Sequence, residues 1–197
     1  MREVELKAVV DDWDDRCRRV REGGGTLVFA GRLEDRRLDT KARDFAQREE
    51  VIRLRIYGDG SAGRAELGWK GPTDYASGYK VREEIQTAVP EPEVMARILE
   101  RLGLVVTRVI DREIAQYEVA GAVVRFERYP RMDDLVEVEG SPEHIERAIA
   151  VLGIARDAFT SERLPQFVRR YQERTGRQAA LCAEELDGIM RYDLEDA

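Results

Sequence analysis

The sequence has little of the chemistry that many enzymes use for nucleophilic or thiolate-based catalysis. Its 197 residues include two cysteines, Cys17 and Cys182, and one histidine, His144. Two cysteines so far apart are too few for a disulfide framework or a thiolate metal site. The histidine lies in an expected helix, so Ser-His-Asp and Cys-His schemes are hard to build. Any catalysis should therefore rest on carboxylates, lysines, arginines and a bound metal.

Long apolar runs and a net positive charge are also missing. No apolar stretch approaches the length of a membrane span, and the first residues form a strand-like pattern rather than a signal peptide. The formal net charge is -7, so nucleic acids and acidic membranes would be repelled overall. We expect a cytoplasmic protein that binds neither nucleic acid nor a membrane.

The remaining composition is that of a folded, highly charged protein. Hydrophobic residues make up 43% and charged residues 37% of the chain, which is enough for one domain with a substantial core or for a domain with a helical appendage. The patterns run in the order strand, helix, several hairpins with two inserted helices, and final helices. This order predicts an α+β fold with a large antiparallel sheet.

The first residues set a pattern that recurs along the chain. Glu3, Glu5 and Lys7 alternate with Val4 and Leu6, so a strand here has one charged face and one apolar face. Two glutamates on one face lie roughly 7 Å apart and repel each other unless a cation is near. A hard divalent metal is one such cation. The alternative is a solvated edge strand whose charges prevent sheet-to-sheet pairing.

Several later strands repeat this alternation. The charged faces together contain Glu3, Glu5, Lys7, Arg53, Arg55, Lys70, Arg82, Glu84, Arg125, Glu127, Glu137 and Glu139. Serine and threonine are nearly absent from these faces, whereas a solvated sheet would tolerate any polar residue. A closed barrel with a charged interior explains the pattern if a ligand balances the charge. The cations would bind a multiply charged anion and the carboxylates Mg²⁺ or Mn²⁺, as in a polyphosphate site.

Residues 26–46 combine a short apolar run with a long charged stretch. The run over residues 26–30 is short and apolar, whereas residues 32–46 are strongly charged. We expect a short strand over residues 26–30 and then a mobile rim element, within which residues 38–44 resemble a strand end followed by a turn. Its basic side chains should be solvated, where they could steer an anion: Arg36, Arg37, Lys41 and Arg43.

An ordered set of motifs resembles a known family, the CYTH superfamily of triphosphate tunnel metalloenzymes. The motifs are Glu3-x-Glu5-x-Lys7, Leu38-Asp39-Thr40, Arg53-x-Arg55, Trp69-Lys70-Gly71-Pro72, Val81-Arg82-Glu83-Glu84 and Leu135-Val136-Glu137-Val138-Glu139. The resemblance spans roughly residues 1 to 165. It implies an eight-stranded antiparallel β-barrel that forms a tunnel, with flanking helices. We therefore expect a tunnel domain over residues 1–176 and a helical, acidic tail over residues 177–197.

The resemblance also implies roles for individual residues. The triphosphate would be bound by Lys7, Arg53, Arg55, Lys70, Arg82, Arg112 and Arg125. One or two Mg²⁺ or Mn²⁺ ions would be held by Glu3, Glu5, Glu127, Glu137 and Glu139. The catalytic residues would be Glu5, Lys7 and Glu127, with an attacking water activated by metal and a carboxylate.

Some positions depart from the family's pattern. The pair Arg37-Leu38 stands where an aromatic residue often precedes the Asp-Thr pair, and Ile114 replaces a basic residue. Glu127 occupies a position where aspartate is usual, and Gln86 one that is commonly acidic.

The sequence leaves the reaction open. The family includes thiamine triphosphatases, inorganic triphosphatases and class IV adenylyl cyclases, in which the ribose hydroxyl rather than water attacks the α-phosphorus. A metal-dependent triphosphatase is our leading hypothesis, and an adenylyl cyclase or a non-catalytic polyphosphate-binding module are the alternatives. The expected partner is a small molecule that contains a triphosphate, bound by a monomer or a homodimer.

Overall fold

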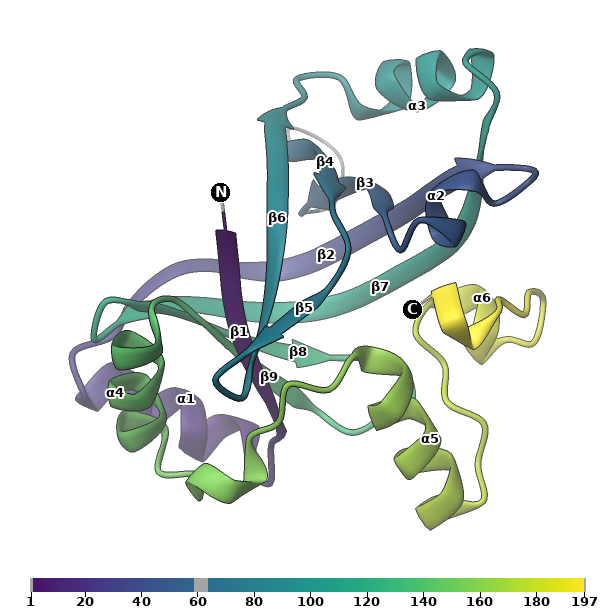
Figure 1. The fold of residues 1–197 in the computed structure, drawn as a ribbon. Helices are drawn as coiled ribbons and strands as arrows, with labels where there is room; N and C mark the ends of the chain where they lie inside the picture. Colours follow the sequence, from purple (N-terminus) through teal and green to yellow (C-terminus); the bar gives the residue numbers. More distant parts are fainter. Residues whose placement is uncertain (1, 59–63, 197) are drawn as a thin grey trace.

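The computed structural model describes residues 2–58 and 64–196 (Figure 1). The strands are β1 (Arg2–Val9), β2 (Thr26–Thr40), β3 (Val51–Tyr57), β4 (Ala65–Lys70), β5 (Asp74–Ala76), β6 (Tyr79–Ala88), β7 (Leu104–Val119), β8 (Ala122–Arg128) and β9 (Leu135–Glu139). The helices are α1 (Trp13–Glu22), α2 (Asp44–Gln47), α3 (Pro92–Arg101), α4 (Pro142–Leu152), α5 (Leu164–Thr175) and α6 (Ala183–Leu186). Two short 3₁₀ turns are η1 (Arg156–Ala158) and η2 (Leu194–Asp196).

Eight of the strands form a closed antiparallel β-barrel. Their order is β1-β9-β8-β7-β2-β3-β4-β6, and β6 pairs back onto β1. The closing pairs include Val4 with Val81 and Glu5 with Lys80. Within the described residues, strand β5 pairs with β6 alone, so it adds to the barrel without closing it. The predicted α+β fold with an eight-stranded antiparallel barrel is confirmed.

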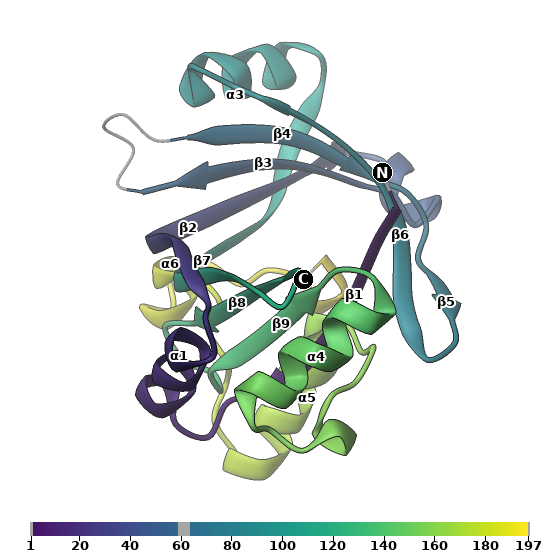
Figure 2. The same cartoon turned by 90° about the vertical axis from the view of Figure 1, so that its left-hand side faces the viewer.

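The outside of the barrel is apolar and is covered by helices on two sides. Helices α1 and α4 lie against one side and α3 against another (Figures 1 and 2). Under α1 and α4, Leu6 of β1, Phe126 of β8 and Val138 of β9 pack on Ile145 and Leu152 of α4. These strand residues alternate with the charged ones, because successive side chains of a strand point to opposite faces. The outer core therefore fixes which side chains face inwards.

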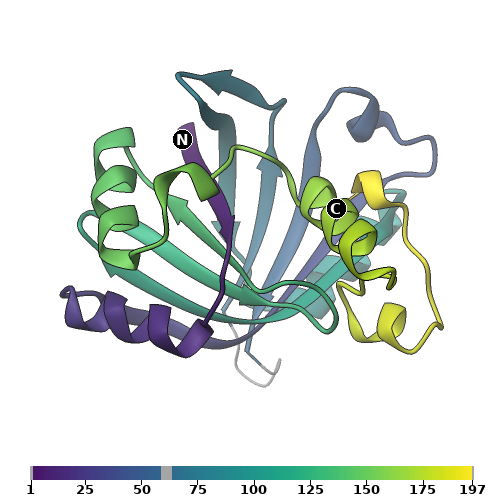
Figure 3. The same ribbon diagram turned by 90° about the horizontal axis from the view of Figure 1, so that it is seen from below.

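The interior has apolar residues on either side of its charged middle. Leu33, Tyr57 and Ile114 form one buried cluster. Ile110 and Leu135 belong to another, where they pack on Phe167 of α5. Figure 3 shows α5 and the segment after it beside one end of the barrel. Apolar packing thus leaves the charged middle as a separate compartment.

Local signals define several element boundaries. The Asp12 carboxylate caps α1 by accepting the Asp15 N–H at 3.0 Å. Ser141 caps α4, as its sequence predicts. Ala120 and Gly121, both with positive φ, join β7 to β8 as a two-residue hairpin turn of the kind that matches strand twist.

The prediction of a mobile rim over residues 32–46 is wrong, although the strand end and turn predicted within residues 38–44 agree with the structure. Strand β2 runs without interruption from Thr26 to Thr40 and pairs with β3 on one side and β7 on the other. Its charged residues occupy a central strand of the barrel rather than a mobile rim. Non-local pairing on both edges, which the local sequence does not reveal, accounts for the difference.

The segment after α5 packs against the barrel. Leu181 is buried with Ile110 and Leu135, and Arg108 of β7 donates to Glu185 at 3.0 Å. Helix α6 supplies the expected helical part. The domain boundary at residue 176 stays a prediction.

None of the helices in residues 2–58 and 64–196 is both long and apolar enough to cross a bilayer.

Candidate active site

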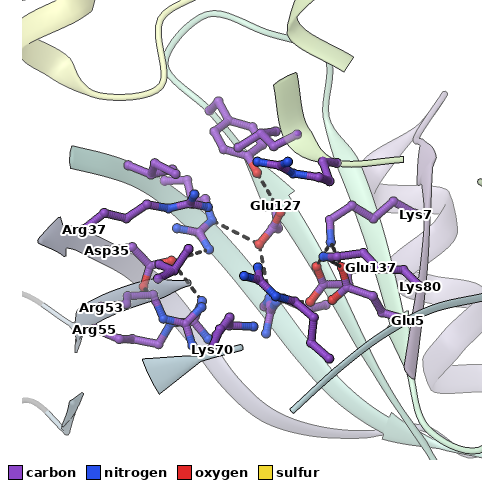
Figure 4. Close-up of a pocket in the computed structure, with 18 residues that line it drawn as sticks. Glu5, Lys7, Asp35, Arg37, Arg53, Arg55, Lys70, Lys80, Glu127 and Glu137 are labelled. Atoms are coloured by element: carbon purple, nitrogen blue, oxygen red, sulfur yellow. Dashed lines mark hydrogen bonds and ion pairs between the residues drawn. The ribbon is translucent and has the colours of Figure 1, made fainter. Parts of the chain in front are cut away.

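The barrel encloses a charged cavity of about 90 Å³ (Figure 4). Most of the residues predicted from the sequence line it: Glu5, Lys7, Arg53, Arg55, Lys70, Arg82, Arg112, Arg125, Glu127 and Glu137. They come from strands β1, β3, β4, β6, β7, β8 and β9. Alternation along each strand, combined with closure of the barrel, brings them to one place.

Lys7 is the centre of the first group of charges. Its Nζ donates to Glu5 Oε1 at 2.8 Å and also to Glu137 Oε2. The register of β1 with β9 places Lys7 directly opposite Glu137. Burial favours a raised pKa for Glu5, but Lys7, Lys80 and Lys70 outweigh it and hold the pKa well below its ordinary value. Glu5 is therefore ionised throughout the neutral range.

Glu127 on β8 is the centre of the second group. Its Oε1 accepts from Arg112 Nε at 3.0 Å and from Arg125 Nε at 3.1 Å. Its Oε2 accepts from the Tyr129 hydroxyl at 2.7 Å. These partners overcome the effect of burial and lower the pKa of Glu127. Arg125 also contacts Glu137, which connects this group to Lys7.

Asp35 on β2 is the centre of the third group. Its two carboxylate oxygens accept from Arg55 at 2.7 and 2.9 Å, a bidentate pair. Arg112 donates to Asp35 Oδ2 at 3.0 Å, and Arg53 lies 3.8 Å from Oδ1. Although burial alone would raise the pKa of Asp35, these arginines hold it well below its usual range. Arg112 thus bridges Asp35 and Glu127.

The wall formed by β4 and β6 adds three further cations. Lys70 contacts Glu84, and Lys80 Nζ donates to Glu5 Oε1 at 2.5 Å. Burial lowers the pKa of Lys80, and Glu5 offsets this only in part. The Arg82 guanidinium donates to the backbone carbonyls of Gly71 and Glu49 at 2.6 and 3.0 Å. Backbone contacts thus fix Arg82 in place.

Together the three groups form a continuous series of ion pairs in which positive and negative side chains alternate. It runs from Arg55 through Asp35, Arg112, Glu127, Arg125, Glu137, Lys7 and Glu5 to Lys80. Such alternation compensates buried charges that would otherwise destabilise the fold. We call this set the charge lattice.

Two positions do not lie where the sequence predicts, and a third is not tested. Arg37, expected in solvent, lines the cavity, because β2 continues through this position and faces Arg37 inwards. Glu139 does not line the cavity. It is partly buried, and its charge raises the pKa of Arg125. The Glu3 side chain lies outside the described residues.

Five charged or polar residues that line the cavity were not predicted from the sequence: Asp35, Arg37, Lys80, Tyr129 and Arg163. Lys80 alternates with Val81 on the same face as Arg82, so the period of the strand could have identified it. Asp35 and Arg37 share a face of β2, but the many charged residues around them made this segment resemble a solvated loop rather than a strand. Arg163 directly precedes α5 and belongs to no periodic pattern.

The donor chemistry of the site fits a hard divalent cation. Glu5 and Glu137 both bind Lys7, and Glu139 is the register partner of Glu5 on β9. Carboxylate oxygens are the donors that Mg²⁺ and Mn²⁺ prefer. Among the described residues, no three acidic, histidine or cysteine side chains converge as a ready-made metal cluster, because lysines and arginines separate the carboxylates.

Comparison with known proteins identifies the family. Residues 1–156 match the CYTH domain. The match covers most of the chain, so the protein belongs to the CYTH family, in agreement with the resemblance seen in the sequence. No curated protein matches it.

Solved structures share the fold at low sequence identity. A candidate adenylate cyclase from Vibrio parahaemolyticus is 18% identical, with a TM-score of 0.71 over 85% of this chain and 97% of that one. The PH1819 protein from Pyrococcus horikoshii is 23% identical, with a TM-score of 0.63 over 89% and 99% of the two chains. A candidate adenylyl cyclase from Hippeastrum, HpAC1, described as having a dominant triphosphatase activity, is 17% identical, with a TM-score of 0.61 over 91% and 98%.

Proposed function

We propose that this protein is a divalent-metal-dependent triphosphatase that works inside the barrel. The carrying observation is the charge of the cavity wall: ten lysine or arginine side chains face four carboxylates. The chain as a whole has a net charge of -7, so the excess positive charge is concentrated at this site. Only an anion with several charges balances it, and a triphosphate is such an anion.

One atom supports the same conclusion. The Nη1 of Arg112 is buried and has no hydrogen-bond partner among the described residues. A buried unsatisfied donor is costly, and a phosphate oxygen in the cavity would satisfy it. Candidate substrates are inorganic triphosphate, thiamine triphosphate and a nucleoside triphosphate.

The phosphate chain would be bound by Arg53 of β3 together with cations of the lattice and of the adjoining wall: Lys7, Arg55, Lys70, Arg82, Arg112 and Arg125. Arginine suits this role because its planar donors match phosphate oxygens. Holding the chain in line for attack, with its charge neutralised, supplies much of the rate in phosphoryl transfer.

A bound Mg²⁺ or Mn²⁺ would be held by Glu5, Glu137 and Glu139, with Glu3, and would supply Lewis-acid polarisation and a more acidic water. Glu127 was expected among these ligands as well as among the catalytic groups. Three side chains already donate hydrogen bonds to its carboxylate, so we favour the catalytic role over that of a metal ligand.

We assign Glu127 as the proton acceptor, with Glu5 beside Lys7 as the second candidate. A water attacks the terminal phosphorus, the bridging P–O bond breaks, diphosphate leaves with the electron pair, and the carboxylate takes the proton. Triphosphate competes with Glu127 for Arg112 and Arg125, which raises the pKa of Glu127 towards its ordinary value. The base thus becomes stronger when substrate is bound.

The test is phosphate release from inorganic triphosphate, thiamine triphosphate and ATP in parallel, with Mg²⁺ or Mn²⁺, while cyclic AMP is measured from ATP. We expect phosphate release that a chelator abolishes. Cyclic AMP formed without phosphate release would indicate a cyclase instead. Binding of triphosphate with no turnover of any substrate would indicate a binding module.

A matched pair of variants locates the activity. Glu137→Gln removes a lattice carboxylate, and Glu113→Gln makes the same change at an exposed position of β7. We expect the first to lower turnover by about 100-fold or more while triphosphate still binds, and the second to behave as wild type. Full turnover in Glu137→Gln would show that the assignment is wrong.

A further inference from the structure

The tunnel opens into a second, outer cavity of about 360 Å³. Arg37, Val51, Arg82 and Arg163 line both cavities, so they mark the boundary between them. Three of these four residues are arginines. We call Arg37 and Arg163 the mouth arginines.

The mouth arginines are not compensated as the lattice cations are. In the described part of the chain, neither guanidinium group makes an ion pair or a hydrogen bond, and Arg37 Nε is buried without a partner. Arg36, the preceding residue on the outer face of β2, is bound to Glu34 at 2.6 Å and to Glu93 at 2.9 Å. Of these two neighbouring arginines, Arg36 points outwards and is neutralised by glutamates, whereas Arg37 points inwards and is not.

Four acidic residues line the outer cavity, and three of them have other partners, while the fourth, Glu49, is exposed to solvent. Asp39 accepts the backbone N–H groups of Thr40, Phe45 and Ala46 at 2.7, 3.0 and 2.9 Å. Glu50 is bound to Arg48, and Glu195 to Arg169. These interactions leave the positive charge of the mouth arginines available to a ligand.

The charges around Arg37 also indicate that its positive charge is not compensated. Burial lowers its pKa to about 9, with Arg53, Arg82 and Arg163 adding repulsion and Asp35 opposing it. A cation in such a place is unfavourable without a counter-anion. An anion at the boundary of the two cavities would relieve both the repulsion and the unsatisfied Nε.

We propose that Arg37 and Arg163 form an additional anion subsite that binds a phosphoryl group beyond the three in the tunnel, so the preferred ligands are linear inorganic polyphosphates of at least four phosphates. This proposal rests on the proposed function, because the subsite extends the triphosphate site outwards. A positively charged organic group, such as the thiazolium of thiamine, would meet repulsion from three arginines here. A longer phosphate chain instead gains a charge-assisted contact at each added unit.

The test is equilibrium binding of inorganic triphosphate and inorganic tetraphosphate to the full chain, by calorimetry, with a chelator present so that no turnover occurs. We expect wild type to bind tetraphosphate about tenfold more tightly than triphosphate, the gain from one charge-assisted contact. Arg37→Gln and Arg163→Gln should each bring that ratio close to one.

Matched controls make the same change in charge away from the mouth. Arg36→Gln lies on the opposite face of β2, and Arg170→Gln on the exposed part of α5, where Arg170 pairs with Glu162. Both should keep the wild-type ratio. Thermal melting of every variant, together with the more conservative Arg37→Lys, separates a lost contact from a lost fold.

The other outcomes are distinct. If wild type binds neither phosphate, the proposed function itself fails. If triphosphate binds but the tetraphosphate ratio is one in wild type, or stays tenfold in both mouth variants, the subsite proposal is wrong. If Arg37→Gln weakens ATP binding and leaves tetraphosphate binding unchanged, the outer cavity holds a nucleoside and the proposal is likewise overturned.

Discussion

The inner tunnel and its mouth hold positive charge in different ways. Inside, carboxylates alternate with lysines and arginines, and Asp35 and Glu127 are 3% and 2% exposed. At the mouth, Arg37 and Arg163 have no such partner among the described residues. The lattice can therefore form as the protein folds, before any ligand arrives. The mouth arginines contribute charge that only a ligand balances.

The largest expected effect comes from breaking the lattice at its bridge. Arg112→Met removes the cation shared by Asp35 and Glu127, and leaves buried carboxylates with fewer partners. We expect a loss of about 3–5 kcal/mol in the free energy of unfolding, measured by urea denaturation, together with loss of triphosphate binding.

The control for this variant is Arg32→Gln. Arg32 binds Asp111 with two contacts of 2.7 Å at the surface of the barrel, and its side chain is 46% exposed. An exposed pair contributes about 0–1 kcal/mol. Equal losses in the two variants would contradict the view that the buried lattice determines stability.

A smaller effect is expected on folding stability at acidic pH. The carboxyl groups of Glu5, Asp35 and Glu127 have folded-state pKa values below their unfolded ones. The unfolded state therefore binds protons first as pH falls. The stability that these groups contribute is complete above their unfolded pKa of about 4 and is lost as pH drops through the folded values.

Asp35→Asn tests this directly. The variant should be less stable than wild type at pH 7, and the difference should shrink between about pH 4 and pH 2 because wild type then loses the contribution of Asp35. Unfolding free energies measured across this range decide the matter. Parallel curves for the two proteins would mean that Asp35 titrates normally.

The smallest effect, and one of opposite sign, is expected at the mouth. Arg37→Met removes a cation that is repelled by its neighbours, so the ligand-free protein should gain about 1 kcal/mol of stability. Without ligand, the melting temperature of the variant should exceed that of wild type. Added tetraphosphate should raise the melting temperature of the variant less than that of wild type. A variant that is less stable than wild type would mean that Arg37 is compensated in the ligand-free protein.

Residues of short alternating strands were the predictable part of the site. Arg53 and Arg55 of β3, Arg125 of β8 and Glu137 of β9 follow from a period of two, and all line the cavity. The same period places Glu139 beside them, yet the strand ends there and Glu139 stays off the cavity wall. Periodicity thus predicts the face of a strand but not the length over which that face borders the site.

The unpredictable part depends on pairing between distant strands. Asp35 and Arg37 lie among charges that resemble a solvated loop, and only the partners β3 and β7 make this stretch a central strand. Arg163 reaches the mouth from the segment before α5. The family resemblance predicted the barrel and most of the charged residues that line the cavity. It did not predict Arg37 or Arg163, because neither belongs to the motifs that carry the resemblance.

The position of β1 constrains the order in which the protein can fold. This strand precedes the other eight along the chain, but its neighbours are β6, which begins at Tyr79, and β9, which begins at Leu135. Closing such long loops is entropically costly, and distant pairings slow folding. Until both neighbours have emerged from the ribosome, β1 has unpaired edges that invite aggregation. Lys7 thus meets Glu137 only after β9 has formed, so the charge lattice is completed late in folding.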